Sequence, residues 1–252
     1  MAADFRLDGR CALVTGAARG LGQAMAIALA EAGADVAGVD IVDLDETRSR
    51  VESAGRRFTA INEDLRGPAA VRRVVDDAAA ALGRLDILIN NAGIIRRADS
   101  IDFSEADWDD VIDLNLKSVF FLAQAAARKF LAQGGRGKIV NIASMLSFQG
   151  GIRVPSYTAA KSGVLGLTRL FANEWAAKGI NVNAIAPGYM ATANTAPLRA
   201  DAARSAEILA RIPAGRWGQP DDLAGAVVFL CSSASDYVHG AVIAVDGGWL
   251  AR

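Results

Sequence analysis

A tyrosine and a lysine four positions apart could carry proton-transfer chemistry in this chain. Tyr157 and Lys161 open an expected helix just after Pro155, and this spacing places both side chains on one helical face. A phenol with an ordinary pKa of about 10 is a poor base at neutral pH, but a neighbouring ammonium favours the phenolate. The pair could therefore exchange a proton with a hydroxyl or carbonyl oxygen. Because Tyr-x-x-x-Lys is also common on exposed helix faces, the pair needs support from other residues.

Two further polar residues are candidates for the same site. Ser144 follows the expected strand 138–143, at the carboxyl edge where open α/β sheets bind ligands, and its hydroxyl could donate to the reacting oxygen. Asn115 lies in the expected helix 106–133, where a buried amide could hold a proton-passing water or could simply be a structural, helix-bending residue. A serine-hydrolase role for Ser144 lacks the Gly-x-Ser-x-Gly pattern, and the one histidine, His239, lies near the end of the chain.

A glycine-rich turn has the features of a pyrophosphate site. The expected strand 11–15 ends in this turn, and a helix follows. Free N–H groups and the helix dipole favour an anion at a helix N-terminus, and glycines allow a tight turn with close backbone approach. A purely structural turn is the alternative, but the strand before it and the helix after it favour a dinucleotide site. The turn residues concerned are Gly16, Arg19, Gly20, Leu21 and Gly22.

An acidic residue ends the second expected strand, roughly twenty residues beyond the glycines. The carboxylate of Asp40 could accept hydrogen bonds from ribose hydroxyls and would repel a 2′-phosphate, which favours NAD over NADP. Arg19 gives the opposite indication, because a cation beside the glycines could pair with that phosphate. Arg19 could equally be a solvated side chain, so the sequence favours NAD.

Short β-type runs alternate with helix-length segments along the whole chain. Strands are expected at 11–15, 35–39, 57–61, 85–90, 138–143, 181–186 and 241–245. Helices are expected near 21–32, 44–54, 68–82, 106–133, 156–177, 201–210 and 221–231. Several strand runs are continuously apolar, as in strands covered on both faces. The alternation predicts an α/β fold with a seven-stranded parallel sheet and helices on both faces.

Composition narrows the class of protein. The 252 residues are 52% apolar and 22% charged, which suits one globular domain. A net charge of −1 argues against a nucleic-acid surface built on excess basic charge, and a single histidine argues against a histidine-rich metal site. Cys11 and Cys231 lie in apolar stretches, as expected of buried thiols in a cytoplasmic protein. The N-terminal stretch MAADFRLDGR lacks the apolar core of a signal peptide, and no run predicts a membrane span.

Taken together, the motifs resemble those of the short-chain dehydrogenase/reductase family in order and spacing, over the whole chain. The matching positions are 15–22, 90–93, Asn115, Ser144, Tyr157, Lys161, Pro187 and Gly188. This resemblance implies a single-domain Rossmann-type doubly wound sheet, a nicotinamide cofactor and usually a tetramer. Apolar residues around much of the circumference of helices 106–133 and 156–177 independently favour a symmetric partner.

The resemblance also implies residue roles. Tyr157 would be the catalytic acid/base, and Lys161 would lower its pKa and hold the nicotinamide ribose. Ser144 would orient the substrate oxygen, and Asn115 would support a proton relay. The implied cofactor-binding residues are Gly16, Arg19, Gly20, Leu21, Gly22, Asp40, Asp64, Leu65, Asn91, Tyr157, Lys161, Pro187, Gly188 and Thr192.

A narrower resemblance is to sugar-acid dehydrogenases of pectin or uronate catabolism within that family. It is carried by segments 90–97, 141–157, 184–192, 211–218 and 245–252. A sugar acid brings a carboxylate, which Arg153 or, as the second choice, Arg97 could bind, although either could be a surface cation. The long connection 189–218 predicts a mobile lid over the substrate, with an ordinary helical insertion as the alternative.

Two other functions remain open at this point. A 3-oxoacyl-carrier-protein reductase would share every catalytic residue, but Asp40 disfavours the NADPH dependence that such enzymes usually show. A non-catalytic NAD-sensing module would not need the complete set of Ser144, Tyr157 and Lys161.

Overall fold

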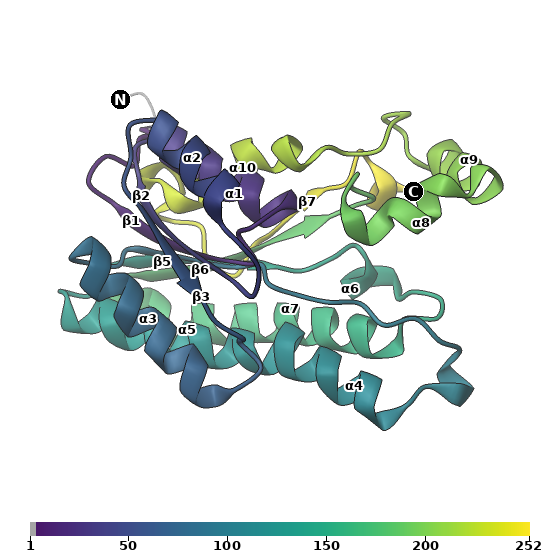
Figure 1. Cartoon of the computed structure of the whole chain (residues 1–252), viewed down its shortest axis with the longest axis horizontal. Helices are drawn as coiled ribbons and strands as arrows, with labels where there is room; N and C mark the ends of the chain where they lie inside the picture. The colour runs from purple at the N-terminus through teal and green to yellow at the C-terminus, as the bar shows by residue number, and fades with distance from the viewer. Residues whose placement is uncertain (1–3) are drawn as a thin grey trace.

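The computed structural model describes residues 4–252, and a seven-stranded parallel sheet lies between two layers of helices (Figure 1). Its strand order is β3-β2-β1-β4-β5-β6-β7, and every neighbouring pair is parallel. The strand bounds are β1 Cys11–Thr15, β2 Asp35–Asp40, β3 Phe58–Asn62, β4 Ile87–Asn90, β5 Gly137–Ile142, β6 Ile180–Pro187 and β7 Val242–Val245. The order reverses between β1 and β4, so the loops after these strands flank a ligand-binding crevice. The predicted doubly wound fold is confirmed.

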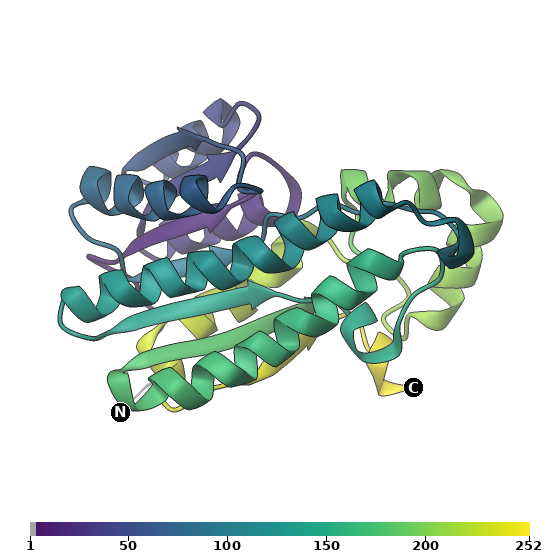
Figure 2. The same cartoon turned by 90° about the horizontal axis from the view of Figure 1, so that it is seen from below.

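Helices cover both faces of the sheet. α1, α2 and α10 lie on one face and α3, α5 and α7 on the other, as Figures 1 and 2 show. The helix bounds are α1 Gly20–Glu31, α2 Asp45–Ser53, α3 Pro68–Leu82, α4 Glu105–Ile112, α5 Ser118–Ala132, α6 Leu146–Gln149, α7 Pro155–Trp175, α8 Ala196–Ala200, α9 Ala202–Arg211 and α10 Ala224–Cys231. The longest, α7, runs alongside α5 and carries Tyr157 and Lys161 in its first turns.

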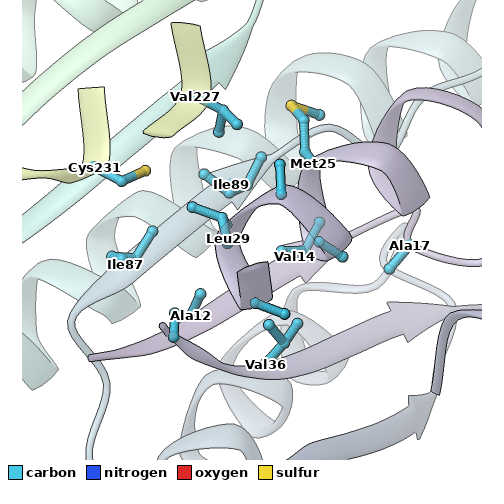
Figure 3. Packing of buried hydrophobic residues seen from close by; sticks show 14 of the residues in the cluster. Ala12, Val14, Ala17, Met25, Leu29, Val36, Ile87, Ile89, Val227 and Cys231 are labelled. Atoms are coloured by element: carbon cyan, nitrogen blue, oxygen red, sulfur yellow. The ribbon is translucent and has the colours of Figure 1, made fainter. Parts of the chain in front are cut away.

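The strands are continuously apolar because alternate side chains enter two different cores. Ala12 and Val14 of β1 pack under α1 and α10, with Met25 and Val227 in the same cluster (Figure 3). Leu13, between them in the sequence, points to the opposite face and joins the cluster under α3 and α5. The period-2 geometry of a strand makes this division inevitable. The sheet is therefore a rigid platform for the loops at its edge.

Element boundaries differ from the sequence prediction mainly at one helix. The expected helix 106–133 is divided into α4 and α5 by one π-helical turn, Asp113–Lys117. Such a turn is a local departure from the 3.6-residue period, so apolar spacing alone does not reveal it. The short helices α6 and α8 were also not predicted. Most other ends differ by one or two residues, as frayed ends commonly do.

The connection 189–218 is a helical segment that contains α8 and α9. The structure therefore has the helical insertion named above as the alternative, and movement of this segment as a lid stays a prediction. Within residues 4–252, no helix has the length and apolar character needed to cross a bilayer. In that same range, no cluster of three or more His, Cys, Asp or Glu side chains could hold a metal. Residues 1–3 of the stretch examined for a signal peptide lie outside the described residues.

Candidate active site

Hydrogen bonds tie the glycine-rich turn to the loop after β4. The Thr15 hydroxyl accepts from the backbone N–H groups of Asn91 and Ala92, both at 3.0 Å. The Asn91 amide donates back to the carbonyls of Thr15 at 2.9 Å and Gly16 at 3.2 Å. Hydrogen bonds within the protein thus hold the two loops that border the crevice in one arrangement, which lowers the ordering cost of binding a ligand.

Two positions of the turn have no room for a side chain and therefore need glycine. A Cβ on Gly22 would lie 2.0 Å from the Gly16 carbonyl oxygen, which is backbone and cannot move aside. Gly16 has φ +67°, a conformation that favours glycine, and its Cβ would meet the Asn91 amide nitrogen at 2.8 Å. The turn opens directly into α1 at Gly20, so backbone N–H groups face the end of the sheet.

Asp40 lies at the end of β2 beside this turn. One carboxylate oxygen accepts from the backbone N–H of Ala18 at 3.1 Å, and the other accepts from that of Ile41 at 2.8 Å. The carboxylate is therefore fixed in place, with lone pairs left for a further donor. Arg19 is exposed and also borders the cavity described below. Both Asp40, which favours NAD, and Arg19, which favours NADP, therefore border the same cavity.

Lys161 is a buried cation aimed at the sheet. Its Nζ donates to the Ile142 carbonyl at 2.6 Å and lies 5.8 Å from the centre of the Tyr157 ring. The side chain is 3% exposed, and burial lowers the pKa of Lys161 to about 8. An ammonium with few partners in a low-dielectric site retains donors for a ligand hydroxyl.

Tyr157 lies next to Ser144, because the start of α7 and the end of β5 bring the two residues together. Burial is the largest effect and raises the pKa of Tyr157, while hydrogen bonding by the Ser144 side chain and the positive charge of Arg97 lower it. A lowering of this pKa by Lys161 with the cofactor bound stays a prediction. Desolvation favours the neutral phenol, which is the form that can donate a proton.

Ser144 follows β5 and is itself positioned by the backbone. Its Oγ accepts from the Leu146 N–H at 3.1 Å, which starts α6, and the side chain is 7% exposed. His239, the base that a hydrolase would need, contacts Asn181 at 3.2 Å, at the start of β6. This is the amino edge of the sheet, opposite the edge at which Ser144 lies. The geometry therefore does not support a serine hydrolase.

A single cavity of about 760 Å³ joins the glycine-rich turn to the tyrosine and lysine. Its lining includes Gly16 and Gly20 at one part, Asp40 at the end of β2, and Tyr157 with Lys161 at another. The size is within the range of cofactor sites. The glycine cradle, the fixed carboxylate and the buried ammonium fit the pyrophosphate and two ribose hydroxyl sites of a nicotinamide dinucleotide. The proposed placement of both motifs at one edge of the sheet is correct.

The other expected cofactor residues divide into two groups. Arg19, Leu21, Gly22, Asp64, Leu65, Asn91 and Thr192 border the cavity. Pro187 and Gly188 are not among its lining residues; Pro187 ends β6, and a Cβ on Gly188 would lie 2.6 Å from the Asp246 Cα. Their place beside the nicotinamide stays a prediction.

Asn115 is fully buried at the centre of the π-helical turn. Its amide oxygen accepts from the Ile94 N–H and its amide nitrogen donates to the Ile94 carbonyl, both at 2.9 Å. The side chain therefore fastens the loop after β4 to the helix and has little capacity left for a water. These two bonds support a structural role for Asn115, and its part in a proton relay stays a prediction.

The two candidate arginines for a substrate carboxylate have different surroundings. Arg153, the first choice, has φ +64° and pairs with Asp99 at 3.1 Å. Arg97, the second choice, donates to the Asn194 carbonyl at 3.1 Å and is near enough to Tyr157 to lower its pKa. Which of the two holds a substrate carboxylate stays a prediction, and Arg97 is the one whose charge acts on Tyr157.

Sequence reasoning missed several residues of the cavity. Arg199 of α8 borders it and donates to the Thr192 carbonyl at 3.1 Å. Asn194 and the exposed side chains of Ile41 and Val42 also border it. No motif marks these positions, because they reach the cavity through the packing of a long segment or lie in a loop. Only the adjacency of Ile41 to Asp40 offered a signal.

Known proteins match this chain over almost its whole length. A family model described as Enoyl-(Acyl carrier protein) reductase matches residues 16–250. The chain is 65% identical over 248 residues to 2-dehydro-3-deoxy-D-gluconate 5-dehydrogenase of Escherichia coli (strain K12), covering 98% of each. The protein of that name from Dickeya dadantii (strain 3937) is 64% identical, with 98% of each covered. A crystal structure of a putative 2-deoxy-d-gluconate 3-dehydrogenase from Agrobacterium tumefaciens with bound NADP has a TM-score of 0.94 at 62% identity, covering 99% of both chains.

Proposed function

Because the chain belongs to the short-chain dehydrogenase/reductase family, we propose that it interconverts a secondary alcohol and a ketone on a sugar acid, using NAD. The enzyme is an oxidoreductase that acts on CH–OH groups. The reaction we assign is that of a 2-dehydro-3-deoxy-D-gluconate 5-dehydrogenase, also described as a 2-deoxy-D-gluconate 3-dehydrogenase. One observation carries the proposal: a single cavity connects the glycine-rich turn with Tyr157 and Lys161.

Each side chain has a defined task in this reaction. A nicotinamide dinucleotide in the cavity would accept or supply the hydride. Tyr157 gives a proton to the substrate oxygen in reduction and takes it back in oxidation. Ser144, beside that phenol, orients the substrate oxygen. Lys161 holds ribose hydroxyls with the donors that remain after its bond to Ile142.

A substrate screen tests the assignment. NAD reduction is followed spectrophotometrically with uronate-derived keto sugars, matched neutral sugars and simple alcohols. We expect turnover with the sugar acids. Activity only with NADPH and a 3-oxoacyl thioester would replace this function by that of a carrier-protein reductase. Dinucleotide binding without turnover of any substrate would indicate a sensing module.

The choice of NAD rests on the carboxylate of Asp40. The NADP bound to the Agrobacterium tumefaciens relative shows that the site of that protein admits the 2′-phosphate. In this chain, the effects of Asp40 and Arg19 on cofactor preference therefore have to be measured separately. Asp40→Asn keeps an acceptor for the Ala18 N–H but removes the charge. We expect kcat/KM for NADP to rise by about tenfold or more and that for NAD to change little. Steady-state kinetics with both cofactors measures this.

Asp43→Asn is the matched control, because Asp43 is exposed and its carboxylate accepts from the N–H of Asp45, the first residue of α2. An unchanged cofactor ratio in Asp40→Asn would assign the selectivity to Arg19 or to the loop backbone.

Arg97 is proposed as the carboxylate-binding residue. A bond between a guanidinium and a carboxylate contributes about 1.5–3 kcal/mol, so Arg97→Ala is expected to lower kcat/KM for the sugar acid by about 10- to 100-fold. The loss on a matched neutral ketone should be much smaller. Arg153→Ala, which breaks only the pair with Asp99, is the control and should affect both substrates alike. Equal losses on both substrates for Arg97→Ala would remove Arg97 from this role.

A homotetramer is proposed as the working form. Leu131 of α5 and Leu170 of α7 are 44% and 43% exposed on the helical layer that carries Tyr157. Exposed leucines on long helices are favoured sites for a symmetric partner. Light scattering at micromolar concentration checks this, and a monomer would contradict it. A cytoplasmic location, inferred from the two buried free thiols, stays a prediction.

A further inference from the structure

Residues 246–252, termed the hook, form a compact turn against α9. Figure 1 shows the end of the chain beside α8 and α9, away from α1 and α2. Asp246 shapes the hook, because its carboxylate accepts from the backbone N–H groups of Gly248 and Leu250, each at 2.9 Å. These bonds start the short helical turn Trp249–Ala251.

Trp249 links the hook to residues next to the active site. The residue is 5% exposed, and its ring centroid lies 4.8 Å from that of Tyr189 in an edge-to-face arrangement with an interplanar angle of 69°. Tyr189 follows the end of β6, and Met145 is the residue next to Ser144. The buried cluster that contains the indole has four members, namely Met145, Ile208, Ile212 and Trp249. One side chain therefore supports the end of β6, the neighbour of Ser144 and α9 together.

Arg252 caps α9. Its guanidinium donates to the carbonyls of Ala210 at 3.1 Å and Arg211 at 2.8 Å, which are among the last acceptors of that helix. A cation at a helix C-terminus satisfies orphan carbonyls and complements the dipole. Arg211 in turn lies 4.1 Å over the Trp249 ring and donates to Gln149 of α6 at 3.2 Å.

The hook is closely fitted on one side and open on another. Gly247 and Gly248 have φ values of +65° and +88°, and a Cβ on Gly248 would lie 3.0 Å from the Pro213 ring. A cavity of about 290 Å³ borders Tyr189, Gly247 and Gly248. The hook is thus not packed all round, so its position depends on the contacts of Trp249 and Arg252.

We infer that the hook positions the substrate side of the active site, acting through Trp249 and Arg252 on α9 and on Met145. The segment ahead of α9 supplies Thr192, Asn194 and Arg199 to the cavity that contains Tyr157. A small displacement of a wall that orients substrate lowers the rate although no reacting group is lost. Trp249 and Arg252 are positioning residues, and the inference rests on the proposed function.

Arg252→Ala is the main test. With the hook released, we expect KM for the sugar acid to rise by about tenfold, kcat to fall less, and the Kd of NADH to stay unchanged. Arg252→Lys keeps one donor for the Arg211 carbonyl and should restore most of the KM. Arg204→Ala is the matched control, because Arg204 lies on α9, the helix that Arg252 caps. Its side chain is exposed and pairs with Glu207 at 2.8 Å. Its kinetics should equal those of the wild type.

Amide exchange gives a readout that does not depend on activity. In Arg252→Ala, protection should fall within 202–211 while the amides of the sheet keep theirs. Trp249→Phe is the second variant, because it removes contacts and also an indole N–H that is buried and has no hydrogen-bond partner among residues 4–252, so the fold should be retained. It should show the same split between KM and Kd.

Three results would overturn the inference: wild-type KM in both hook variants, equal loss of NADH affinity and sugar-acid affinity, or a change of oligomeric mass that accounts for the loss. Failure of the proposed function is a separate outcome. It would appear as a wild-type enzyme without turnover of sugar acids. The exchange measurement alone would then show whether the hook holds α9 in place.

Discussion

Tyr157→Phe is expected to lower kcat by about 100- to 10,000-fold, because one hydroxyl performs the proton transfer in both directions. Binding of NADH should be unchanged, since Phe retains the ring and the first turn of α7. Tyr237→Phe is the matched control, because Tyr237 is 99% exposed. Single-turnover kinetics and fluorescence titration of NADH separate the two properties. A Tyr157→Phe enzyme that keeps more than about a tenth of its turnover would assign the proton transfer elsewhere.

The direction of the pKa shift adds a pH dependence. Oxidation of an alcohol needs the phenolate of Tyr157, whereas reduction of a ketone needs the phenol. Burial raises the pKa of Tyr157, so the phenolate fraction at neutral pH is low and increases with pH. The rate of oxidation should therefore rise through the alkaline range, while reduction is already supported at pH 7. Initial rates in both directions from pH 6 to pH 10 check this.

Lys161→Met is expected to remove turnover and at the same time to stabilise the fold. The pKa of Lys161 falls from 10.5 to about 8 through burial, which corresponds to about 3 kcal/mol against the charged form. Loss of the bond to Ile142 costs roughly 1 kcal/mol, so the free energy of unfolding at pH 7 should rise by about 2 kcal/mol. Urea unfolding of the cofactor-free protein measures this.

The sign of the pH dependence distinguishes this cause from better packing. Between the folded pKa of about 8 and the unfolded value of 10.5, the unfolded wild type binds more protons, so its stability rises with pH. The advantage of Lys161→Met should therefore be full below pH 8 and shrink toward pH 10.5. Lys178→Met, at an exposed position, should show neither effect. A destabilised Lys161→Met at pH 7 would mean that the ammonium is stabilised by its partners.

The parts of the site that local chemistry determines were predictable from sequence. A buried parallel strand followed by glycines and a helix leaves few structures open, and Gly22 shows why, since no side chain fits there. The Tyr157 and Lys161 spacing places both residues on one face of α7 by helical geometry. The same regularities give the seven strands, because alternate residues such as Ala12 and Leu13 fill opposite cores.

Other features depend on contacts between distant residues, and the sequence does not display those. The π-helical turn at Asn115 is stabilised by both polar atoms of Ile94, twenty-one positions away. Arg153 was preferred over Arg97 because it lies near Tyr157 in sequence, but its pairing with Asp99 occurs only in the folded chain. The sign of the Tyr157 pKa shift depends on burial, which an isolated Tyr-x-x-x-Lys motif does not encode.

The small cluster of Met145, Ile208, Ile212 and Trp249 is separate from the large cores on the two faces of the sheet. Substitutions in α8 or α9 can therefore reshape the pocket without loosening the strands that hold the glycine-rich turn. Selection for a new sugar could then proceed in this region at little risk to folding, while the dinucleotide end is inherited unaltered. Such a division gives a lineage of enzymes a physical route to new substrates.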